Sequence, residues 1–372
     1  MDPSSRTAHP LAVTGIGVYT PIGKSREEFW HSVAEGICGV KEIEGFPVDA
    51  LRVKHAAEIV DHDPAQLSPA EQELDWTAQF GLLAARQAIA DSGLSESLRQ
   101  SSRLGLIVGV CAGGQGTSPL QRTPENTFDV PLRDFPDTAI YRQTDAIGAS
   151  LGIHGPRSTV STACASSGTA LAYAYDLLQD DTADALLVGG TDAFSMSTYA
   201  GFYALGAMPV QPISPFSENT GVSFGEGSGF VVLEPLAKAM TRGAQIYGLL
   251  LGYGSTGDAH HVTAPHPSGE GLHRAMAWAL RRGDFAPEQI DYINAHGTAT
   301  RDNDRAESSA IRELFGSKEA VPPVSSSKSQ FGHTLGAAGI LEFIVSVLAT
   351  REGVLPPTVN FTSRGGQCGC HP

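Results

Sequence analysis

Short apolar runs of strand length recur along the chain, and most of them run into glycine. They read LAVTGIG, LGLIVGVC, ADALLVGG, GFVVLE, YGLLLGYGS and IDYINAHG. Between several of these runs lie segments with apolar residues at helical spacing, such as TAQFGLLAARQAIADSG and GAAGILEFIVSVLATREG, and both segments end in glycine. This alternation of strand and helix patterns predicts an α/β fold.

Composition and charge narrow the class of protein. The chain has 372 residues, of which 41% are hydrophobic and 17% charged, as in a globular protein with a sizeable core. Its formal net charge of -15 argues against a nucleic-acid partner, because phosphate binding depends on clustered Lys and Arg. No apolar run reaches the roughly 18 residues of a membrane helix, and the start MDPSSRTAHP lacks the pattern of a signal peptide. We therefore expect a cytoplasmic protein that does not bind membranes.

One of the 5 cysteines lies in a position that suits a nucleophile. Cys164 lies in STACASSGTALAYAYDLL, where a strand pattern meets an apolar helix. A helix N-terminus lowers the pKa of a thiol, and small neighbouring residues would let a thioester approach. The N–H of Cys164 could stabilise an oxyanion. The alternative is an inert buried cysteine, since free cysteine is among the most buried residue types.

Two further segments place polar residues where predicted strands end or helices begin. His296 follows a strand pattern in NAHGTATRDND, and Lys328 and His333 precede a glycine-rich helix start in SSSKSQFGHTLGAAGILE. Polar residues offered from strand ends toward one crevice are how α/β folds build sites. A single histidine of this kind is more often structural, but the set as a whole indicates an active site.

These segments resemble the motifs of a known family. TACASSGTA, NAHGTAT and KSQFGHTLGAAGILE are similar to those of the β-ketoacyl-acyl carrier protein synthases, the condensing enzymes of type II fatty acid and polyketide synthesis. VTGIGVYTPIG, LLVGGTDA, GEGSGFVVLEPLAKAMTRGA and LPPTVNF also match, in family order across almost the whole chain. The resemblance implies a thiolase-like fold with two similar αβ halves in a five-layer αβαβα arrangement. We place the first half, with the nucleophile, at residues 1–247 and the second, with both histidines, at residues 248–372.

The resemblance also implies catalytic roles. Cys164 matches the acylated nucleophile, and His296 and His333 match the pair that assists decarboxylation of the malonyl thioester and stabilises the enolate. Lys328 matches the lysine that organises the second of these histidines, and Glu342 matches a glutamate that supports the site. The residue types suit a Claisen condensation, because a soft nucleophile holds one acyl chain while neutral imidazoles donate to the thioester oxygen. This chemistry requires no metal and no bound cofactor.

Substrate-binding residues follow from the same resemblance. Thr298 and Thr300 match the threonines that hydrogen-bond the phosphopantetheine arm, which the acyl carrier protein delivers. Ala112 lies where relatives often have a larger residue lining the acyl pocket, and Phe202 and Tyr203 are candidates for the pocket wall. A smaller residue predicts a longer pocket, and therefore medium or long acyl chains, saturated or unsaturated; the alternative is that neighbouring bulk compensates.

The chain departs from the family pattern at its end. After LPPTVNF the family continues to a glycine-rich GFGGTNG loop and a closing strand, whereas this sequence ends in TSRGGQCGCHP. We interpret the difference as an apparent truncation of the second half. Loss of a loop that gates the acyl pocket and supplies an oxyanion N–H predicts a rate loss of about 10²-fold or more. Cys368 and Cys370 beside His371 are too few for a structural zinc site, which takes about four ligands.

A second departure concerns the carrier protein. In HDPAQLSPAEQELDWTAQF, the residues Glu71, Glu73 and Asp75 lie where many relatives have Arg and Lys that face the acidic carrier. Docking would then use other residues, such as Arg301 and Arg305, or a partner subunit. The alternative is a solvated acidic helix without a part in docking.

Several functions stay open at this point. The first is a decarboxylating β-ketoacyl synthase, as a homodimer or as a heterodimer with a related ketosynthase-like subunit. The second is a non-catalytic chain-length-factor-like partner, which the altered C-terminus favours and the retained Cys164 opposes. A Cys-His hydrolase would leave His333 and Lys328 unexplained. A thiolase would need a second cysteine in a glycine-rich context that neither Cys368 nor Cys370 has.

Overall fold

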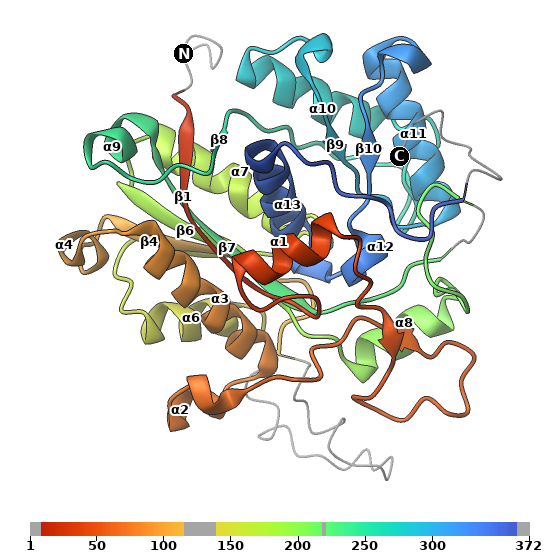
Figure 1. Ribbon diagram of the computed structural model, residues 1–372, viewed down its shortest axis with the longest axis horizontal. Coiled ribbons are helices and arrows are strands. Elements are labelled where there is room, and N and C mark those ends of the chain that lie inside the picture. Colours follow the sequence, from red (N-terminus) through yellow and green to blue (C-terminus); the bar gives the residue numbers. More distant parts are fainter. Residues whose placement is uncertain (1–8, 115–138, 218–220, 363–372) are drawn as a thin grey trace.

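A mixed sheet of 6 strands forms the centre of the first part of the chain (Figure 1). The computed structural model describes residues 9–114, 139–217 and 221–362. The strands of this sheet are β1 (Leu11–Tyr19), β4 (Leu104–Gly109), β5 (Arg157–Val160), β6 (Ala185–Asp192), β7 (Gly227–Pro235) and β8 (Gly248–Leu250). They lie in the order β5-β4-β6-β7-β1-β8, with β4, β5 and β6 parallel and β7 antiparallel to β6 and β1.

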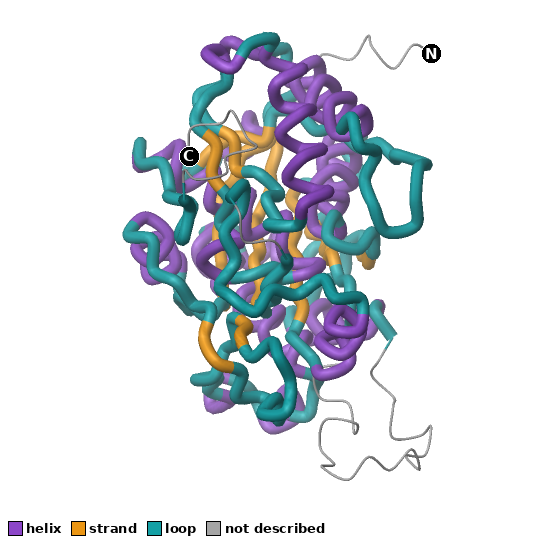
Figure 2. Tube along the Cα trace, turned by 90° about the vertical axis from the view of Figure 1, so that its right-hand side faces the viewer, coloured by secondary structure: helices purple, strands orange, loops and turns teal. Residues whose placement is uncertain are grey.

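Helices cover both faces of this sheet (Figures 1 and 2). On one face α3 (Trp76–Ser92) and α6 (Tyr141–Ser150) pack against the side chains of Leu106 and Val108. On the other face α7 (Ser166–Gln179) and α13 (Ala338–Glu352) pack against Ile107. Both faces of β4 are therefore buried, which explains why its sequence is apolar at consecutive positions instead of alternating.

The remaining helices and strands are short or lie toward the periphery. They are α1 (Arg26–Ala34), β2 (Lys41–Glu42), β3 (His55–Ala56), α2 (Pro69–Gln72), α4 (Glu96–Arg99), α8 (Met196–Ala204), α9 (Leu236–Thr241), α10 (Glu270–Gly283), β9 (Ile293–Asn294), α11 (Arg301–Phe315), β10 (Val324–Ser325), the 3₁₀ turn η6 (Leu335–Ala337) and α12 (Lys328–Phe331).

Glycines in the VTGIGVYTPIG motif let α3 approach β1 closely. A Cβ atom on Gly15 would lie 2.2 Å from the carbonyl oxygen of Ala88, and one on Gly17 would lie 1.9 Å from that of Ala84. Real side chains do not fit at such distances, so the helix backbone packs directly on the strand backbone.

A second, smaller sheet lies beyond α13. β9 and β10 pair in parallel, and Ile293 and Val324 share an apolar cluster with Ile311 of α11 and Met276 of α10. The layers run α3 and α6, large sheet, α7 and α13, small sheet, α10 and α11, which is the predicted αβαβα order (Figure 1). In the described residues the small sheet has 2 strands against 6 in the large one, so the two halves are unequal.

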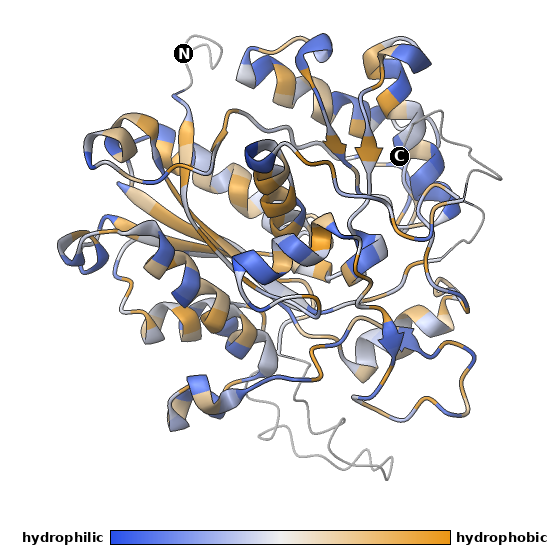
Figure 3. Cartoon of the chain, viewed as in Figure 1, coloured by the Kyte–Doolittle hydropathy of each residue, from blue (hydrophilic) through white to orange (hydrophobic). Residues whose placement is uncertain are grey.

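The run YGLLLGYGS, which we expected to open the second half, instead supplies β8 to the edge of the large sheet, paired with β1. The division at residue 247 stays a prediction. Figure 3 shows the apolar residues concentrated in the central strands and in α13, whereas α10 and α11 carry apolar and hydrophilic residues side by side. No helix in the described part of the chain has the length and hydropathy needed to cross a bilayer.

The acidic segment before α3 is not one solvated helix, contrary to one of our two interpretations. α2 ends at Gln72, and Glu71 pairs with Arg86. Asp75 is buried and caps α3, because its carboxylate accepts the N–H of Thr77. The predicted absence of a C-terminal gating loop concerns residues 363–372, including Cys368, Cys370 and His371, which lie outside the described residues.

Candidate active site

Cys164 lies in the short turn between β5 and α7. Ala163 immediately before it adopts a left-handed backbone conformation with φ of 50°, and α7 begins at Ser166. The thiol therefore lies beside the N-terminus of an apolar helix, as predicted. A non-glycine residue in this conformation stores backbone strain, which is common next to reactive groups.

The imidazole of His333 contacts the Cys164 thiol. Nε2 of His333 lies 2.9 Å from Sγ of Cys164. Nδ1 of His333 accepts the backbone N–H of Leu335 at 3.2 Å. A neutral imidazole has one donor and one acceptor nitrogen, so the Leu335 contact places the proton on Nε2. His333 is thus oriented to donate a hydrogen bond to the sulfur or to an oxygen bound near it.

His296 is held by a buried ion pair. Nζ of Lys328 lies 3.1 Å from Nδ1 of His296, and the same ammonium pairs with the carboxylate of Glu342. We expected Lys328 to organise the second histidine, His333, but the hydrogen bond joins it to His296. An ammonium can only donate, so His296 also carries its proton on Nε2. The rings of His296 and His333 are perpendicular, with centroids 5.4 Å apart.

Burial decides the protonation states in this site. It lowers the pKa of both His296 and His333 well below the ordinary value, and the positive charge of Lys328 acts in the same direction. Burial also raises the pKa of the Cys164 thiol, while Lys328 and the N–H of Cys164 oppose that rise. The lowering that we predicted from the helix N-terminus is therefore outweighed. Two neutral imidazole donors beside a thiol can stabilise negative charge on sulfur or on oxygen.

A glutamate that the sequence analysis missed supports His296. The buried carboxylate of Glu307 accepts the backbone N–H of His296 at 2.7 Å and that of Gly297 at 2.8 Å. Asp304, one helical turn earlier on α11, accepts the N–H of Phe216 at 2.7 Å. The signal was present in RDNDRAE, where the two carboxylates are three residues apart directly after NAHGTAT and so share a helix face.

The predicted substrate-binding threonines lie next to His296. Oγ1 of Thr298 and Oγ1 of Thr300 are 2.9 Å apart, and Thr300 caps the start of α11. Thr298 is buried, whereas Thr300 is partly exposed. The pair therefore lies directly after His296, with Thr300 at the start of α11.

The three predicted acyl-pocket residues share one apolar cluster. Ala112, Phe202 and Tyr203 pack against a group that includes Phe224 and Leu335. The rings of Phe202 and Phe224 have centroids 4.5 Å apart, and Phe224 stacks on His333 at 6.1 Å. Apolar side chains thus extend from His333 to the predicted pocket wall.

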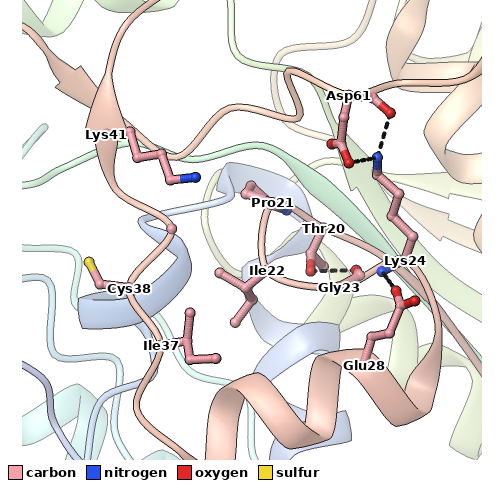
Figure 4. A pocket seen from close by; sticks show the side chains of 11 residues that line it. Thr20, Pro21, Ile22, Gly23, Lys24, Glu28, Ile37, Cys38, Lys41 and Asp61 are labelled. Carbon is pink, nitrogen blue, oxygen red and sulfur yellow. Dashed lines mark hydrogen bonds and ion pairs between the residues drawn. The ribbon is translucent and has the colours of Figure 1, made fainter.

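A separate pocket of about 280 Å³ is lined by residues between Thr20 and Lys41 and by Asp61 (Figure 4). Lys24 and Lys41 line it, and Lys24 pairs with Asp61. None of its lining residues is a predicted site residue. Two of its lining residues touch the backbone of α12. Sγ of Cys38 lies 3.5 Å from the carbonyl oxygen of Ser329, and the N–H of Gly39 donates to the carbonyl oxygen of Gln330 at 2.7 Å.

A metal ion fits the central residues poorly. Cys164, His296 and His333 offer ligand atoms within 4.8 Å of one another. However, the Lys328 ammonium is hydrogen-bonded to His296, and its charge would repel a cation held there. The donor set suits thiol chemistry better than metal binding.

Comparison with known proteins agrees with this geometry. The model of the beta-ketoacyl synthase N-terminal domain matches residues 8–239, and that of the beta-ketoacyl synthase C-terminal domain matches residues 247–362. This chain belongs to the beta-ketoacyl synthase family. It is 35% identical to 3-oxoacyl-(acyl-carrier-protein) synthase 2 of Synechocystis sp., over 96% of this chain and 89% of that protein.

Solved structures of ketosynthases share the fold. The ishigamide ketosynthase/chain length factor superimposes with a TM-score of 0.88 at 31% identity, covering 98% of this chain and 91% of that one. A type II polyketide synthase acyl-carrier protein in complex with its ketosynthase bound to the hexaketide gives 0.86 at 27% identity, with the same coverage. The predicted thiolase-like ketosynthase fold is confirmed.

The lowered pKa of His333 makes folding stability depend on pH. His333 is neutral in the folded protein, whereas in the unfolded chain it binds a proton below its ordinary value near 6.5. The unfolded state then binds more protons, so stability falls as pH drops from about 6.5 toward the folded pKa, by up to about 1.4 kcal/mol per pH unit. Urea unfolding at several pH values between about 7.5 and 5 should show a smaller slope in His333→Asn than in the wild type, because His296 still contributes to the slope of the variant.

His154, an exposed histidine on the surface, provides the matched control, and His154→Asn should follow the wild type. Carboxylates elsewhere contribute equally to all three proteins, so the difference in slope isolates His333. Equal slopes for wild type and His333→Asn would show that His333 is not held neutral by the fold.

Proposed function

We propose that this chain condenses a carrier-bound acyl chain with malonyl-acyl carrier protein, releasing CO₂ and giving a β-ketoacyl-acyl carrier protein. The proposal depends most on one observation, the 2.9 Å contact between Sγ of Cys164 and Nε2 of His333, with the His296 ring beside them. The enzyme is an acyltransferase of type II fatty acid or polyketide, including polyene, synthesis. The relative from Synechocystis sp. carries the name of such a synthase.

The first half-reaction is acyl transfer to sulfur. The Cys164 thiol gives up its proton, and the resulting thiolate attacks the thioester carbonyl of the acyl carrier. The C–S bond to the carrier then breaks, and the leaving carrier thiolate takes up that proton. The hydrogen bond from His333 and the N-terminus of α7 stabilise the thiolate against the effect of burial. The apolar cluster around Phe202 and Ala112 takes up the acyl chain.

The second half-reaction forms the carbon–carbon bond. Nε2–H groups of His296 and His333 donate to the thioester oxygen of the malonyl group, so that loss of CO₂ leaves an enolate with its charge on that oxygen. The enolate carbon attacks the acyl carbonyl on Cys164, and the C–S bond breaks to regenerate the thiolate. Neutral imidazoles suit this step because each ring can donate a hydrogen bond from its Nε2–H while the other nitrogen stays unprotonated.

The remaining site residues serve this pair of histidines and the substrate arm. Lys328, neutralised by Glu342, holds His296 in the donor tautomer. The phosphopantetheine arm, delivered by the carrier, would run past Thr298 and Thr300 toward Cys164. No bound cofactor is needed for these steps.

We also propose a dimer and a docking face for the carrier. β5 is an edge strand of the large sheet and leads directly to Cys164, so pairing along β5 with a second ketosynthase-like subunit would extend the sheet and brace the nucleophile turn. Similar structures include a ketosynthase/chain length factor and a ketosynthase with its carrier protein. Arg301 and Arg305 are exposed at the start of α11, next to Thr300, and suit an acidic carrier surface. A cytoplasmic location belongs to this proposal.

The alternative of a non-catalytic chain-length-factor-like subunit is not favoured. A subunit that only shapes a pocket has no use for a thiol in contact with His333 or for a buried ammonium bonded to His296. The buried Lys328 ammonium also sets the His296 tautomer, a role that belongs to a histidine acting as a donor.

Intact-protein mass tests the reaction directly. Acyl carrier should add one acyl group to the wild type, and malonyl carrier should then remove it and give β-ketoacyl carrier. Cys164→Ala should gain no acyl mass, while the matched Cys38→Ala, outside the site, should behave as wild type. If the acyl adduct is instead lost to water, with no β-ketoacyl carrier formed, the chain is a hydrolase. A wild type that never acylates would favour the partner subunit.

The size of residue 112 should set the acyl-chain length. Ala112→Phe would fill part of the cluster beside Phe202, so we expect short acyl carriers to acylate Cys164 at near-normal rates and long ones to lose about tenfold or more. Competition between short and long acyl carriers, followed by intact mass, measures the ratio. An unchanged ratio would show that Ala112 does not line the acyl pocket.

A further inference from the structure

Asp192, which has no part in the proposed reaction, is buried at the centre of the site. It ends strand β6, and its relative exposure is 0%. Its oxygens accept four backbone N–H groups: Cys111 at 2.8 Å, Ala112 at 2.9 Å, Gly113 at 3.2 Å and Gly336 at 2.7 Å. Burying a carboxylate is unfavourable without such donors.

The four donors belong to two segments that the reaction uses for different purposes. Residues 111–113 carry Ala112, which packs in the apolar cluster of the acyl-pocket wall. Gly336 lies in the turn after His333, next to Leu335, whose N–H donates to Nδ1 of His333. The two segments are far apart in sequence, and Asp192 joins them through Oδ2, which accepts from both Cys111 and Gly336.

The absence of a side chain at Gly336 lets the backbone of this turn approach the Asp192 carboxylate closely. A Cβ atom on Gly336 would lie 2.5 Å from Oδ2 of Asp192 and 2.6 Å from the backbone nitrogen of Cys111. Leu335 before it has a left-handed backbone, with φ of 51°. Such a conformation persists only when the surroundings hold it, and the bond from Gly336 to Asp192 is one such restraint.

We propose that Asp192 is a positioning residue that couples the acyl-pocket wall to His333. The carboxylate fixes the turn whose Leu335 N–H sets the tautomer and place of His333, and it fixes the loop that carries Ala112. One carboxylate therefore positions both the loop that contacts the acyl chain and the imidazole that contacts Cys164. The assignment of this cluster as an acyl pocket rests on the proposed function. The contact between His333 and Cys164 can be probed without any condensation.

Asp192→Asn is the direct test. The amide keeps the shape of the carboxylate but replaces one acceptor oxygen with an NH₂ group, so one pair of backbone donors loses its partner. Glu226→Gln is the matched control, because Glu226 is also buried and, among the described residues, its carboxylate accepts the backbone N–H groups of Ile59 and Phe194. Thermal unfolding of both variants shows how much stability each has lost.

Two readouts separate positioning from a general loss of stability. The first is the rate at which iodoacetamide alkylates Cys164, followed in the peptide that contains it at several pH values. Displacing the His333 donor destabilises the thiolate, whereas removing the Asp192 charge, which raises the pKa of the Cys164 thiol, acts in the opposite direction. A variant that moves the turn and keeps this charge should therefore react about tenfold more slowly below the thiol pKa, which corresponds to a rise of about one pKa unit. The second is the ratio of short to long acyl adducts on Cys164, which should change in Asp192→Asn and not in Glu226→Gln.

Gly336→Ala is such a variant, because it disturbs the hydrogen bond between Gly336 and Asp192 at its donor. Its methyl group would push the Gly336 N–H from Asp192 while the carboxylate remains, so it should slow alkylation in the same way. It carries the test if Asp192→Asn fails to fold. A wild-type alkylation rate in folded Gly336→Ala, or a wild-type adduct ratio in folded Asp192→Asn, would overturn the proposal, as would an equal change in Glu226→Gln. A wild type that does not condense would refute the proposed function but leave the alkylation comparison intact.

Discussion

The Lys328 ammonium is fully buried, and the geometry of the site follows from how its charge is satisfied. A buried charge costs several kcal/mol unless it is paired and hydrogen-bonded. Glu342, projecting from α13, supplies the opposite charge, and Nδ1 of His296 supplies a neutral acceptor. These two contacts bring α12, α13 and the end of β9 together. They also place the His296 proton on Nε2. Burial lowers the pKa of both histidines, and the positive charge of Lys328 lowers it further, so both rings are neutral.

Carboxylates that never touch the substrate hold the loops around this charge. Glu307 accepts the backbone N–H groups at His296, and Asp192 accepts those around Ala112 and after His333. Each loop would otherwise bury unsatisfied donors, which is costly in the interior. The large sheet therefore provides rigidity, while buried acids fix the irregular segments on which the reactive side chains lie.

Local patterns predicted the regular elements well. The helical spacing before Gly93 and Gly353 gave α3 and α13, and both glycines adopt the left-handed conformation that ends a helix. Residue motifs also identified Cys164, His296 and His333, which the fold brings together from distant segments.

Other features depend on tertiary contacts that no local pattern contains. An apolar run shows that a strand is buried but not which strand lies beside it, so β8 joined the large sheet unexpectedly. The choice of Lys328 between the two histidines depends on where α12 packs. Asp75 looked like part of an acidic surface because a helix cap and a solvated acid have the same residue type. The role of Asp192 was invisible because its partners are backbone groups of other segments.

The nitrogen chemical shifts of the histidine rings test the central claim most directly. In protein labelled with ¹⁵N histidine, His296→Asn and His333→Asn variants would assign the two signals. The account predicts that both rings are neutral, with the proton on Nε2, from about pH 8 down to about pH 5.5. Protonation of either ring near its ordinary pKa of about 6.5, or a proton on Nδ1 of His296, would contradict it.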